Sequence, residues 1–595
     1  MASILVVRDP DPERRRRTAA AARAILHEEP GFEGGSIERG PVTAVWAAGP
    51  NTPIDLHQDA RRDTLLLGEF LGPSGPDRVT AADYAATRDS RSGIPEPCDG
   101  YHVAVCLTEA GALTVAADLL GIFPVYHTMV GEALLVASSP GLLRAHPAFR
   151  NGIDPLGIAG LLLCNSLLGG FTIQRGVRRL AAGHALVAAA GRPPSEHRHY
   201  AIPTDRASHD VPIAECAERL HAALREACRR HVAPGVPHTL LLSGGLDSRL
   251  LAGILRDQAQ SITALTRGLR TDIEYRCARK VAVRLGLPHR LMPDEPGTYD
   301  TFSRGIQRDG LVASPGGGGS NLVAALRALG PRMLSGHGMD GVLGPIYLQW
   351  VYSDKDRSVG FDNYFRHLNA YGIRVEVLRR LLRRDVFGDS LDEALDLLRE
   401  TFQNLGGAEM ERAWRFNLHH RQRFFTGAAT NRHARGAWPV LPFMDRQVLA
   451  ATGGMPLVVL ADRSLEQLLL RRFHPELARL PLDRNTLDTT PLAPDLRGLL
   501  EDLGSRVLRR VRRLLRLGPR QRLYYYRTFN FNGPQWRGIR EGAEPKREAA
   551  YALFDRAGFD ALLPPPDRPW SGGDGIVDVA GAKTLLGLVA WLDQG

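Results

Sequence analysis

The sequence predicts an α+β region followed by an α/β region, on three observations. In the first 200 residues, short apolar strands alternate with turn residues such as Asp99-Gly100. From residue 213, a helix, a short apolar strand, a glycine-rich turn and a second helix follow one another, which is typical of a parallel sheet covered by helices. Beyond about residue 355 the pattern is mostly helical. A chain of 595 residues that is 44% hydrophobic has enough apolar residues for several domains.

The first region is expected to consist of short strands joined by tight turns. These strands include Val103–Leu107, Leu113–Ala117 and Ala133–Ala137. Pro193 and Pro194 open a polar stretch that runs to Asp210, and this composition predicts a linker. We therefore expect a first domain over residues 1–200, a second over 211–500 and a helical extension over 501–595.

The second region alternates between helix and strand. Its expected elements are the helix Ile213–His231, the strand Thr239–Leu242, the helix Arg249–Arg256, the strand Ser261–Thr266, the helix Ile273–Leu285 and a strand at Met333–Leu334. This succession predicts a parallel sheet with helices packed on it.

Composition and charge exclude several classes of protein. The net charge of +10 is spread over the whole chain, so we expect neither nucleic acid nor a membrane to be a partner. No run of about 18 apolar residues occurs, which argues against an integral membrane protein. The six cysteines form no C-x-x-C pair, and no secretory signal opens the chain, so a cytoplasmic protein with buried thiols is expected. The sequence leaves a homodimer open.

The segment Leu240-Leu241-Leu242-Ser243-Gly244-Gly245-Leu246-Asp247-Ser248 carries the sharpest chemical signal. A strand that runs into small residues and then a helix presents several backbone N–H groups to one point, where pyrophosphate can bind. Asp247 can hold Mg²⁺ through a carboxylate oxygen. The predicted nucleotide-binding residues are Leu241, Ser243, Gly244, Gly245, Asp247 and Ser248. The alternative is a turn that only packs tightly. The lysine of the G-x-x-x-x-G-K-[ST] loop is missing, which disfavours γ-phosphate transfer.

This segment resembles the PP-loop of ATP pyrophosphatases, which split ATP into AMP and pyrophosphate. A second segment, Leu334-Ser335-Gly336-His337-Gly338-Met339-Asp340, resembles the S-G-x-G-x-D loop of asparagine synthetases and their relatives. The resemblance implies an adenine-nucleotide α-hydrolase-like parallel sheet, with Asp247 and Asp340 on Mg²⁺ and with Ser335 and Gly336 near the nucleotide. Pro442-Phe443-Met444-Asp445-Arg446 is similar to a later segment of the same family.

The first region resembles the glutaminase domain of that family, a β-sandwich flanked by helices whose nucleophile is N-terminal (Ntn-type). The likeness rests on Asp118-Leu119-Leu120-Gly121-Ile122-Phe123-Pro124-Val125-Tyr126 and on the segment 179–184. In these glutaminases the nucleophile is a cysteine exposed by removal of Met1. Here residue 2 is Ala, and the family's N-G-E segment reads Leu67-Gly68-Glu69. We therefore expect a fold retained without glutaminase activity.

Three positions of the second region depart from the family and bear on catalysis. His337 stands where asparagine synthetases usually have Glu and where β-lactam synthetases have a Tyr that deprotonates the attacking amine. Imidazole suits that proton transfer, and the alternative is a histidine that only hydrogen-bonds the loop. The family's adenylation lysine has no counterpart in residues 480–486, where Arg484 could supply the charge. Gly341 replaces the family's usual Glu after Asp340.

The resemblance implies an ATP-dependent, amide-forming ligase with ATP and Mg²⁺ as cofactors. A substrate carboxylate would attack the α-phosphorus of ATP, and an amine would then displace AMP. The substrate would be a small molecule or a peptide that supplies both groups, as in β-lactam synthetases and lasso-peptide macrolactam cyclases of specialised metabolism. Two alternatives remain, an asparagine synthetase that uses free ammonia and a non-catalytic relative that acts as a scaffold.

Overall fold

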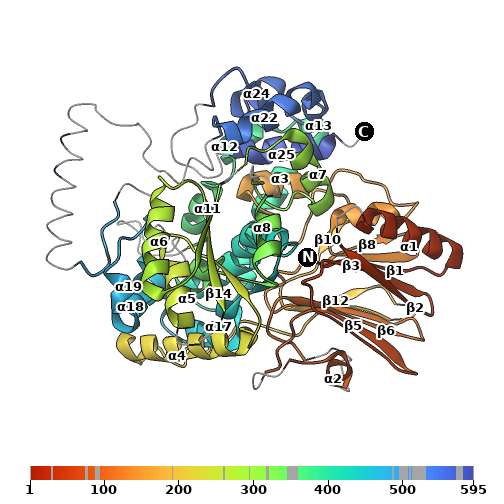
Figure 1. The fold of residues 1–595 in the computed structure, drawn as a ribbon. Helices are drawn as coiled ribbons and strands as arrows, with labels where there is room; N and C mark the ends of the chain where they lie inside the picture. The colour runs from red at the N-terminus through yellow and green to blue at the C-terminus, as the bar shows by residue number, and fades with distance from the viewer. Residues whose placement is uncertain are drawn as a thin grey trace.

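A computed structural model describes most of residues 2–593 (Figure 1). It does not describe residues 28–30, 74–77, 87–93, 95, 190–191, 257, 259–260, 294, 317–320, 345–359, 485–487, 495–506, 508–510, 512–530 and 571–580. The described residues form an N-terminal β-sandwich, a parallel sheet covered by helices, and a helical part that contains the C-terminal helices.

Two six-stranded antiparallel sheets make up the sandwich, in the orders β10-β8-β9-β1-β3-β2 and β12-β11-β7-β6-β5-β4. Their strands are β1 (Ala2–Arg8), β2 (Glu33–Arg39), β3 (Val42–Ala48), β4 (Ile54–Gln58), β5 (Arg62–Gly68), β6 (His102–Thr108), β7 (Leu113–Ala117), β8 (Tyr126–Val130), β9 (Ala133–Ala137), β10 (Arg178–Arg179), β11 (His184–Ala188) and β12 (Ser195–Arg198). Alternate residues such as Val103, Val105 and Val115 point into the space between the sheets and belong to one buried core. The predicted sandwich is confirmed.

Helices cover the outer faces of the sandwich. Helix α1 (Pro12–His27) packs its buried residues Ala19, Ala22 and Leu26 on the sheet that contains β1 and β3. The short helix α2 (Ala81–Ala86) covers the other sheet at β4 and β5. The resulting four layers bury both faces of both sheets over much of their length.

A parallel sheet of five strands, in the order β15-β14-β13-β16-β17, forms the second region. The strands are β13 (His238–Leu241), β14 (Ile262–Arg267), β15 (His289–Met292), β16 (Arg332–Ser335) and β17 (Trp438–Val440). Strands β15 and β17 were not expected from the sequence. Both are short edge strands, and β17 contains Pro439, which has no N–H to donate and therefore gives a poor strand signal.

Helices pack on both faces of this sheet. Helices α4 (Ile213–His231), α5 (Leu246–Arg256), α6 (Ile273–Leu285) and α17 (Arg446–Gly453) share one core with Leu240 and Leu334. Helix α8 (Asn321–Leu329) packs on the other face, against Leu265 and Met333. The bounds of α4 and α6 are those that the apolar spacing predicts, whereas α5 begins three residues earlier, directly after the glycine turn.

The other helices lie between and around these two regions. They are η1 (Pro140–Ala145), α3 (Pro155–Cys164), α7 (Tyr299–Asp309), α9 (Met339–Leu343), α11 (Phe361–Asn369), α12 (Val375–Leu381), α13 (Arg384–Phe387), α14 (Ser390–Asn404), α15 (Glu409–Asn417), the π-helix η2 (Leu418–Thr426), α16 (Gly427–His433), η3 (Pro442–Met444), η4 (Leu457–Arg463), α18 (Ser464–Phe473), α19 (Pro475–Ala478), α22 (Pro534–Ala543), η5 (Glu544–Lys546), α23 (Glu548–Tyr551), α24 (Arg556–Leu562) and α25 (Ala582–Leu592).

A second core joins distant parts of the chain. Ile158 of α3, Leu378 of α12 and Trp536 of α22 all belong to it. A helix from the first 200 residues thus packs with the C-terminal helices, and Figure 1 shows α3 beside α12 and α25. The helical character expected for the end of the chain agrees with α22 to α25.

A buried ion network joins the sandwich to the second region. Asp445, at the start of α17, pairs with Arg230 and lies 3.0 Å from Nε2 of His231. Arg230 also lies 3.1 Å from Asp99 of the sandwich, and Arg446 donates to Asp99 at 3.0 Å. Burial raises the pKa of Asp99, and the nearby carboxylate of Asp445 acts in the same direction. The P-F-M-D segment therefore ties the two regions together.

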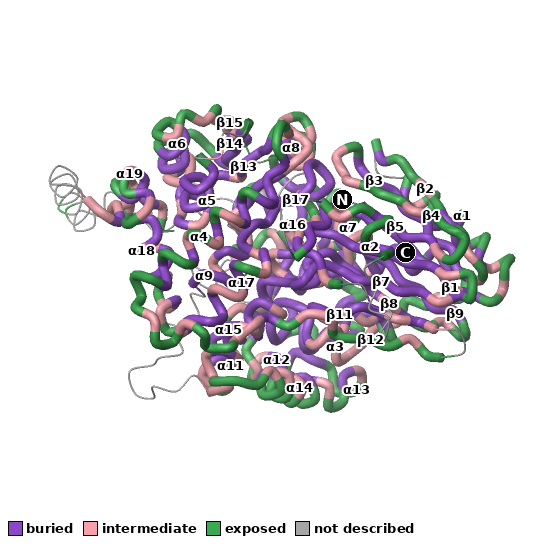
Figure 2. Tube along the Cα trace, turned by 90° about the horizontal axis from the view of Figure 1, so that it is seen from below, coloured by how far each residue is buried: buried purple, intermediate pink, exposed green. Residues whose placement is uncertain are grey.

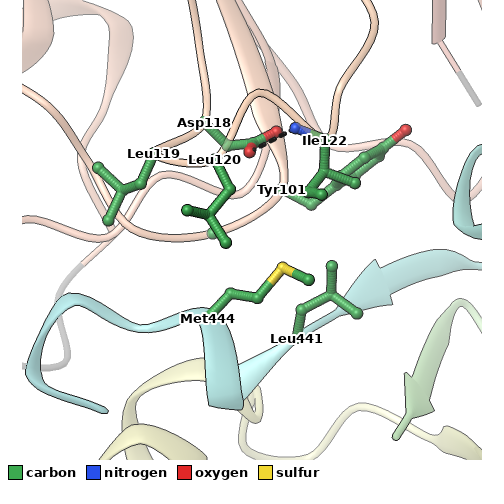
Figure 3. Close-up of a pocket in the computed structure, with 8 residues that line it drawn as sticks. Tyr101, Asp118, Leu119, Leu120, Ile122, Leu441 and Met444 are labelled. Carbon is green, nitrogen blue, oxygen red and sulfur yellow. Dashed lines mark hydrogen bonds between the residues drawn. The ribbon is translucent and has the colours of Figure 1, made fainter. Parts of the chain in front are cut away.

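Beside this network, apolar side chains close the interface. Tyr101, Leu120 and Ile122 from the sandwich face Leu441 and Met444 across a cavity of about 10 Å³ (Figure 3). That volume holds about one water. The two regions are therefore in close contact at this point.

Among the described residues, no single helix is both long and apolar enough to cross a membrane. The pair Arg446–Gly453 and Leu457–Phe473 passes a test of length and composition together, but it bends by 106°.

Candidate active site

The two loops singled out in the sequence lie side by side at the carboxyl edge of the parallel sheet. The first follows β13 and the second follows the neighbouring strand β16, with Leu241 opposite Ser335. A Cβ at Gly336 would lie 2.8 Å from Cβ of Asp247 and 3.0 Å from N of Ser248. Only glycine allows this approach, so the second loop is seated directly on the start of α5. Parallel α/β sheets bind ligands at this edge.

Hydroxyl groups hold the first loop in shape. Oγ of Ser248 accepts a hydrogen bond from N of Ser243 at 3.0 Å and lies 2.9 Å from Oγ of Ser243. Oγ of Ser243 accepts from N of Gly245 at 3.2 Å. Gly244 has no room for a side chain, because a Cβ there would lie 2.7 Å from Cβ of Cys277 and 2.7 Å from Cβ of Asp483. The loop is thus a preformed, narrow turn at a helix N-terminus, the geometry that binds phosphate groups.

Arg249, directly after the loop, clamps a distant segment onto it. This fully buried guanidinium donates to the carbonyl oxygens of Leu477 and Leu480 at 3.0 Å each, and to that of Gly244 at 3.2 Å. N of Asp483 donates to the same Gly244 oxygen at 2.9 Å. Arg249 was not predicted to be part of the site, although it directly follows Ser248 in the sequence.

A cation lies among the acidic groups of the two loops. Arg463 forms an ion pair with Asp247 and lies 2.6 Å from Glu466. Burial opposes the charge of Arg463, but the carboxylates of Asp247, Glu466 and Asp340 outweigh it and raise the pKa of Arg463. Burial and the carboxylate of Asp247 raise the pKa of Asp340. Asp247 and Asp340 thus lie close enough for their charges to repel, in agreement with the contact between Gly336 and Asp247.

These carboxylates fit a Mg²⁺ that is bound together with phosphate groups. Mg²⁺ takes oxygen ligands and is usually held by one or two carboxylates plus substrate phosphates. Asp247 and Asp340 provide that donor set, and their mutual repulsion would fall with a cation between them. Within the part of the chain that the structure describes, no group of three or more His, Cys, Asp or Glu residues is placed to hold a metal ion by itself.

His337 lies in the second loop beside a second histidine. Its ring centroid is 5.4 Å from that of His433, and its backbone N donates to Oγ of Ser335 at 3.0 Å. Among described residues, Nδ1 of His337 and Nδ1 of His433 have no hydrogen-bond partner. Burial lowers the pKa of His337 to about 4, and the positive charge of Arg432 adds to the shift. The imidazole is therefore neutral at pH 7 and can accept a proton, although as a weaker base than a free histidine.

Arg484 directly follows Asp483, whose backbone N donates to Gly244 of the first loop. Its side chain is exposed, and Nη2 donates to the carbonyl oxygen of Thr490 at 3.0 Å. The cation that pairs with Asp247 is Arg463, which sequence reasoning missed. The role expected for Arg484 stays a prediction.

Gly341 is explained by a neighbouring helix. A Cβ at this position would lie 2.7 Å from Cδ of Gln422, whose side chain projects from the π-helix η2. Gln422 in turn accepts a hydrogen bond from Oγ1 of Thr426 at 2.7 Å. The space that a glutamate would need after Asp340 is therefore filled by another segment. Such π-helical turns are frequent at functional sites.

The comparisons with known proteins agree with this geometry. The family model described as asparagine synthase matches residues 219–477, which contain both loops, and the model described as glutamine amidotransferase domain matches residues 95–200 of the sandwich. The fold and the two matches define a class of protein in which an asparagine-synthase-type α/β domain is joined to an amidotransferase-type sandwich. The chain belongs to the asparagine synthetase family.

Individual relatives match only part of the chain. Asparagine synthetase (glutamine-hydrolyzing) 3 of Bacillus subtilis is 26% identical over 33% of this chain and 31% of its own length. Amidase chyE of Penicillium rubens is 30% identical over 26% of this chain and 22% of its own length. The matches thus span less than a third of these curated relatives. The solved allosteric regulatory enzyme of purine biosynthesis is 14% identical over 51% of this chain and 77% of that one, with a TM-score of 0.23, which supports no conclusion.

Proposed function

We propose that the chain is an ATP-dependent ligase that adenylates a substrate carboxylate and joins it to an amine. The contact of Gly336 with Asp247 supports this proposal most directly, because it brings the two loops of an asparagine synthase site onto one edge of the sheet. Triphosphate bound there would meet the N–H groups at the start of α5 and the two coupled carboxylates.

The residues of the two loops would bind the leaving pyrophosphate and the metal ion. Ser243, Gly244, Gly245 and Ser248 would hold the pyrophosphate that leaves when the carboxylate attacks the α-phosphorus. Asp247 and Asp340 would hold Mg²⁺, which when bound neutralises phosphate charge. The acyl-adenylate would then react with an amine to give an amide and AMP.

His337 is proposed as the group that accepts the proton released by the amine. Its imidazole is neutral, and in the described residues Nδ1 has no other hydrogen-bond partner. Arg463 would supply the positive charge next to Asp247, where the family lysine has no counterpart in residues 480–486.

Two residues of the sandwich support the proposal that the amine does not come from glutamine. Ala2 and Leu67 stand at the positions of the family's nucleophile and of its oxyanion-binding Asn, and both are fully buried in strands β1 and β5. We propose that the amine belongs to the substrate itself, a small molecule or peptide, so that the reaction closes a ring in a specialised metabolite. Free ammonia is the alternative source.

Release of pyrophosphate and AMP by the purified protein with ATP and MgCl₂ tests the proposal. Three mixtures are compared: aspartate with ammonium, aspartate with glutamine, and small molecules and peptides extracted from the producing cell. Turnover only with the extract supports a dedicated amide synthetase. Turnover with aspartate and ammonium would instead identify an ammonia-dependent asparagine synthetase. Failure to bind ATP would contradict the ligase proposal and favour a non-catalytic relative.

A further inference from the structure

We infer that the outer face of α6 is a docking site for an acidic peptide segment of a substrate or partner protein. A groove of about 550 Å³ runs along this helix and is bounded on its other side by Leu480, just after α19. Five cationic residues line it, namely Arg270, Arg276, Arg279, Lys280 and Arg284. The helix presents exposed residues along this face (Figure 2).

Among the described residues, the five cations of the groove have no ion-pair partner. Within the described part of the chain, none of them takes part in an ion pair or donates a side-chain hydrogen bond, whereas on α4 Arg219 pairs with Glu215 and Arg229 with Glu226. Arg276, Lys280 and Arg284 follow one another at i,i+4 spacing, which places like charges side by side and destabilises an isolated helix. An anionic ligand would relieve this repulsion.

The spacing of the charges favours a chain over a single ion. At a rise of about 1.5 Å per residue, the backbone positions of Arg276 and Arg284 lie roughly 12 Å apart along the helix. A single phosphate or carboxylate placed between these two positions would leave the other cations of the groove without a counter-charge. An extended segment with several carboxylates can pair with successive turns.

Apolar side chains between the cations favour a peptide over a nucleic acid. Val283 is 71% exposed on the same face, and Leu480 lines the opposite side of the groove. The ring of Tyr275 stacks on His289, with centroids 5.3 Å apart, so this face of the tyrosine is not available to stack on a base. A segment that combines acidic and aliphatic side chains matches both the charge and the exposed apolar surface.

The groove is connected to the loop after β13 through the clamp described above. The carbonyl oxygen of Leu480 accepts a hydrogen bond from Arg249, which also donates to that of Gly244. Cβ of Cys277, in α6, would lie 2.7 Å from a Cβ at Gly244. A segment docked on α6 would therefore contact the helix that packs against the loop after β13. The inference does not depend on the proposed function, because binding can be measured without ATP.

The test is binding of a fluorescein-labelled peptide of repeated Glu-Leu to the full chain, followed by fluorescence anisotropy. Arg279→Glu/Lys280→Glu should weaken binding by about tenfold or more, since two cations of the groove are reversed. The control, Arg16→Glu/Arg225→Glu, makes the same change of net charge at exposed positions of α1 and α4 and should bind like the unsubstituted protein.

Equal weakening by both double substitutions would overturn the inference, because attraction would then depend on net charge alone. Binding of a labelled single-stranded oligonucleotide that is tighter and equally sensitive to Arg279→Glu/Lys280→Glu would also overturn it, in favour of nucleic acid. Self-association that is lost in the same variant would assign the face to a second copy of the chain. Circular dichroism and thermal unfolding check that both variants keep the helix content and the stability of the unsubstituted protein.

Discussion

Arg463 and Asp247 form an ion pair although 216 positions of the chain separate them. Arg463 closes η4 with φ +60, directly after Asp462 with φ +56, so two consecutive residues adopt the left-handed conformation that side chains rarely adopt. Such backbone strain persists where the surrounding structure holds it. Here it accompanies a guanidinium that contacts Asp247 and Glu466 together.

Removing this guanidinium should destabilise the protein. Arg463→Gln leaves Glu466, which is fully buried, without its ion-pair partner, and breaking a buried pair costs about 3–5 kcal/mol. Urea unfolding measures the loss. The exposed pair of Arg472 with Glu218 provides the control, because Arg472→Gln should cost less than about 1 kcal/mol. Equal unfolding midpoints for the two variants would contradict the structural role of Arg463.

Asp247 should be required for pyrophosphate release. Asp247→Asn removes one of the two negative charges proposed to bind the cation and should lower the rate by about 100-fold or more. Asp362→Asn, on the exposed face of α11, changes net charge equally and should keep the rate. A full rate for Asp247→Asn, measured with the substrate that supports turnover, would rule out the assigned site.

Gly341 should tolerate no side chain. Gly341→Ala places a methyl group against Gln422 and should lower the free energy of unfolding by about 1–3 kcal/mol. Gly305, within α7, has nothing within 4 Å of an added Cβ, so Gly305→Ala should raise stability by about 0.5–1 kcal/mol. In thermal unfolding, the melting temperature should fall for Gly341→Ala and rise for Gly305→Ala. Shifts of the same sign would be inconsistent with the packing of η2 against Gly341.

Asp118 should make stability depend on pH. Burial raises the pKa of Asp118 to about 6, although N–H groups of Phe123 and Ile122 donate to it. The folded state thus keeps a proton that the unfolded chain releases near pH 4, so the free energy of unfolding falls as pH rises from about 4 to about 6, by up to about 3 kcal/mol.

Asp118→Asn should remove this contribution. Unfolding free energies of the variant and of the unsubstituted protein are compared at both ends of the window. The exposed Asp300→Asn substitution, at the start of α7, controls for the change of net charge. An unchanged pH slope in Asp118→Asn would show that this carboxyl group titrates at the same pH in both states.

Arg230 should contribute to the stability of the joined regions far more than its neighbour. Arg230→Met leaves Asp99 and Asp445 buried without their shared cation and should cost about 3–5 kcal/mol. Arg229→Met breaks only an exposed pair with Glu226 and should cost less than about 1 kcal/mol. The two variants differ by one position on the same helix, so differential scanning calorimetry compares them directly.

Local patterns predicted the parts of the molecule that local interactions determine. The apolar spacing of Ile213–His231 and Ile273–Leu285 predicted both helices to the residue, because each helix buries one face. The strand, glycine turn and helix around Ser243–Ser248 were likewise predicted, since each backbone conformation follows from neighbouring residues.

Tertiary contacts decided what the sequence alone did not predict. Strand β17 has three residues and exists because it pairs with β16, which lies more than 100 positions earlier. Arg463 and His433 reach the site from segments without a motif of their own. The side chain of Gln422 fills the space that a glutamate at position 341 would need. Gln422 belongs to a π-helix, and the spacing of residues in the sequence did not predict that conformation.

The network of Asp99, Arg230 and Asp445 also bears on how the chain could evolve. The proposed loss of glutamine chemistry would ordinarily remove the selection that keeps the sandwich. Here, separating the sandwich from the second region at the linker would leave the buried Arg230 without Asp99. It would also expose Leu441 and Met444 to water. Selection for a folded second region would therefore preserve the sandwich even without a reaction of its own, because the buried network makes the fold of one region depend on the other.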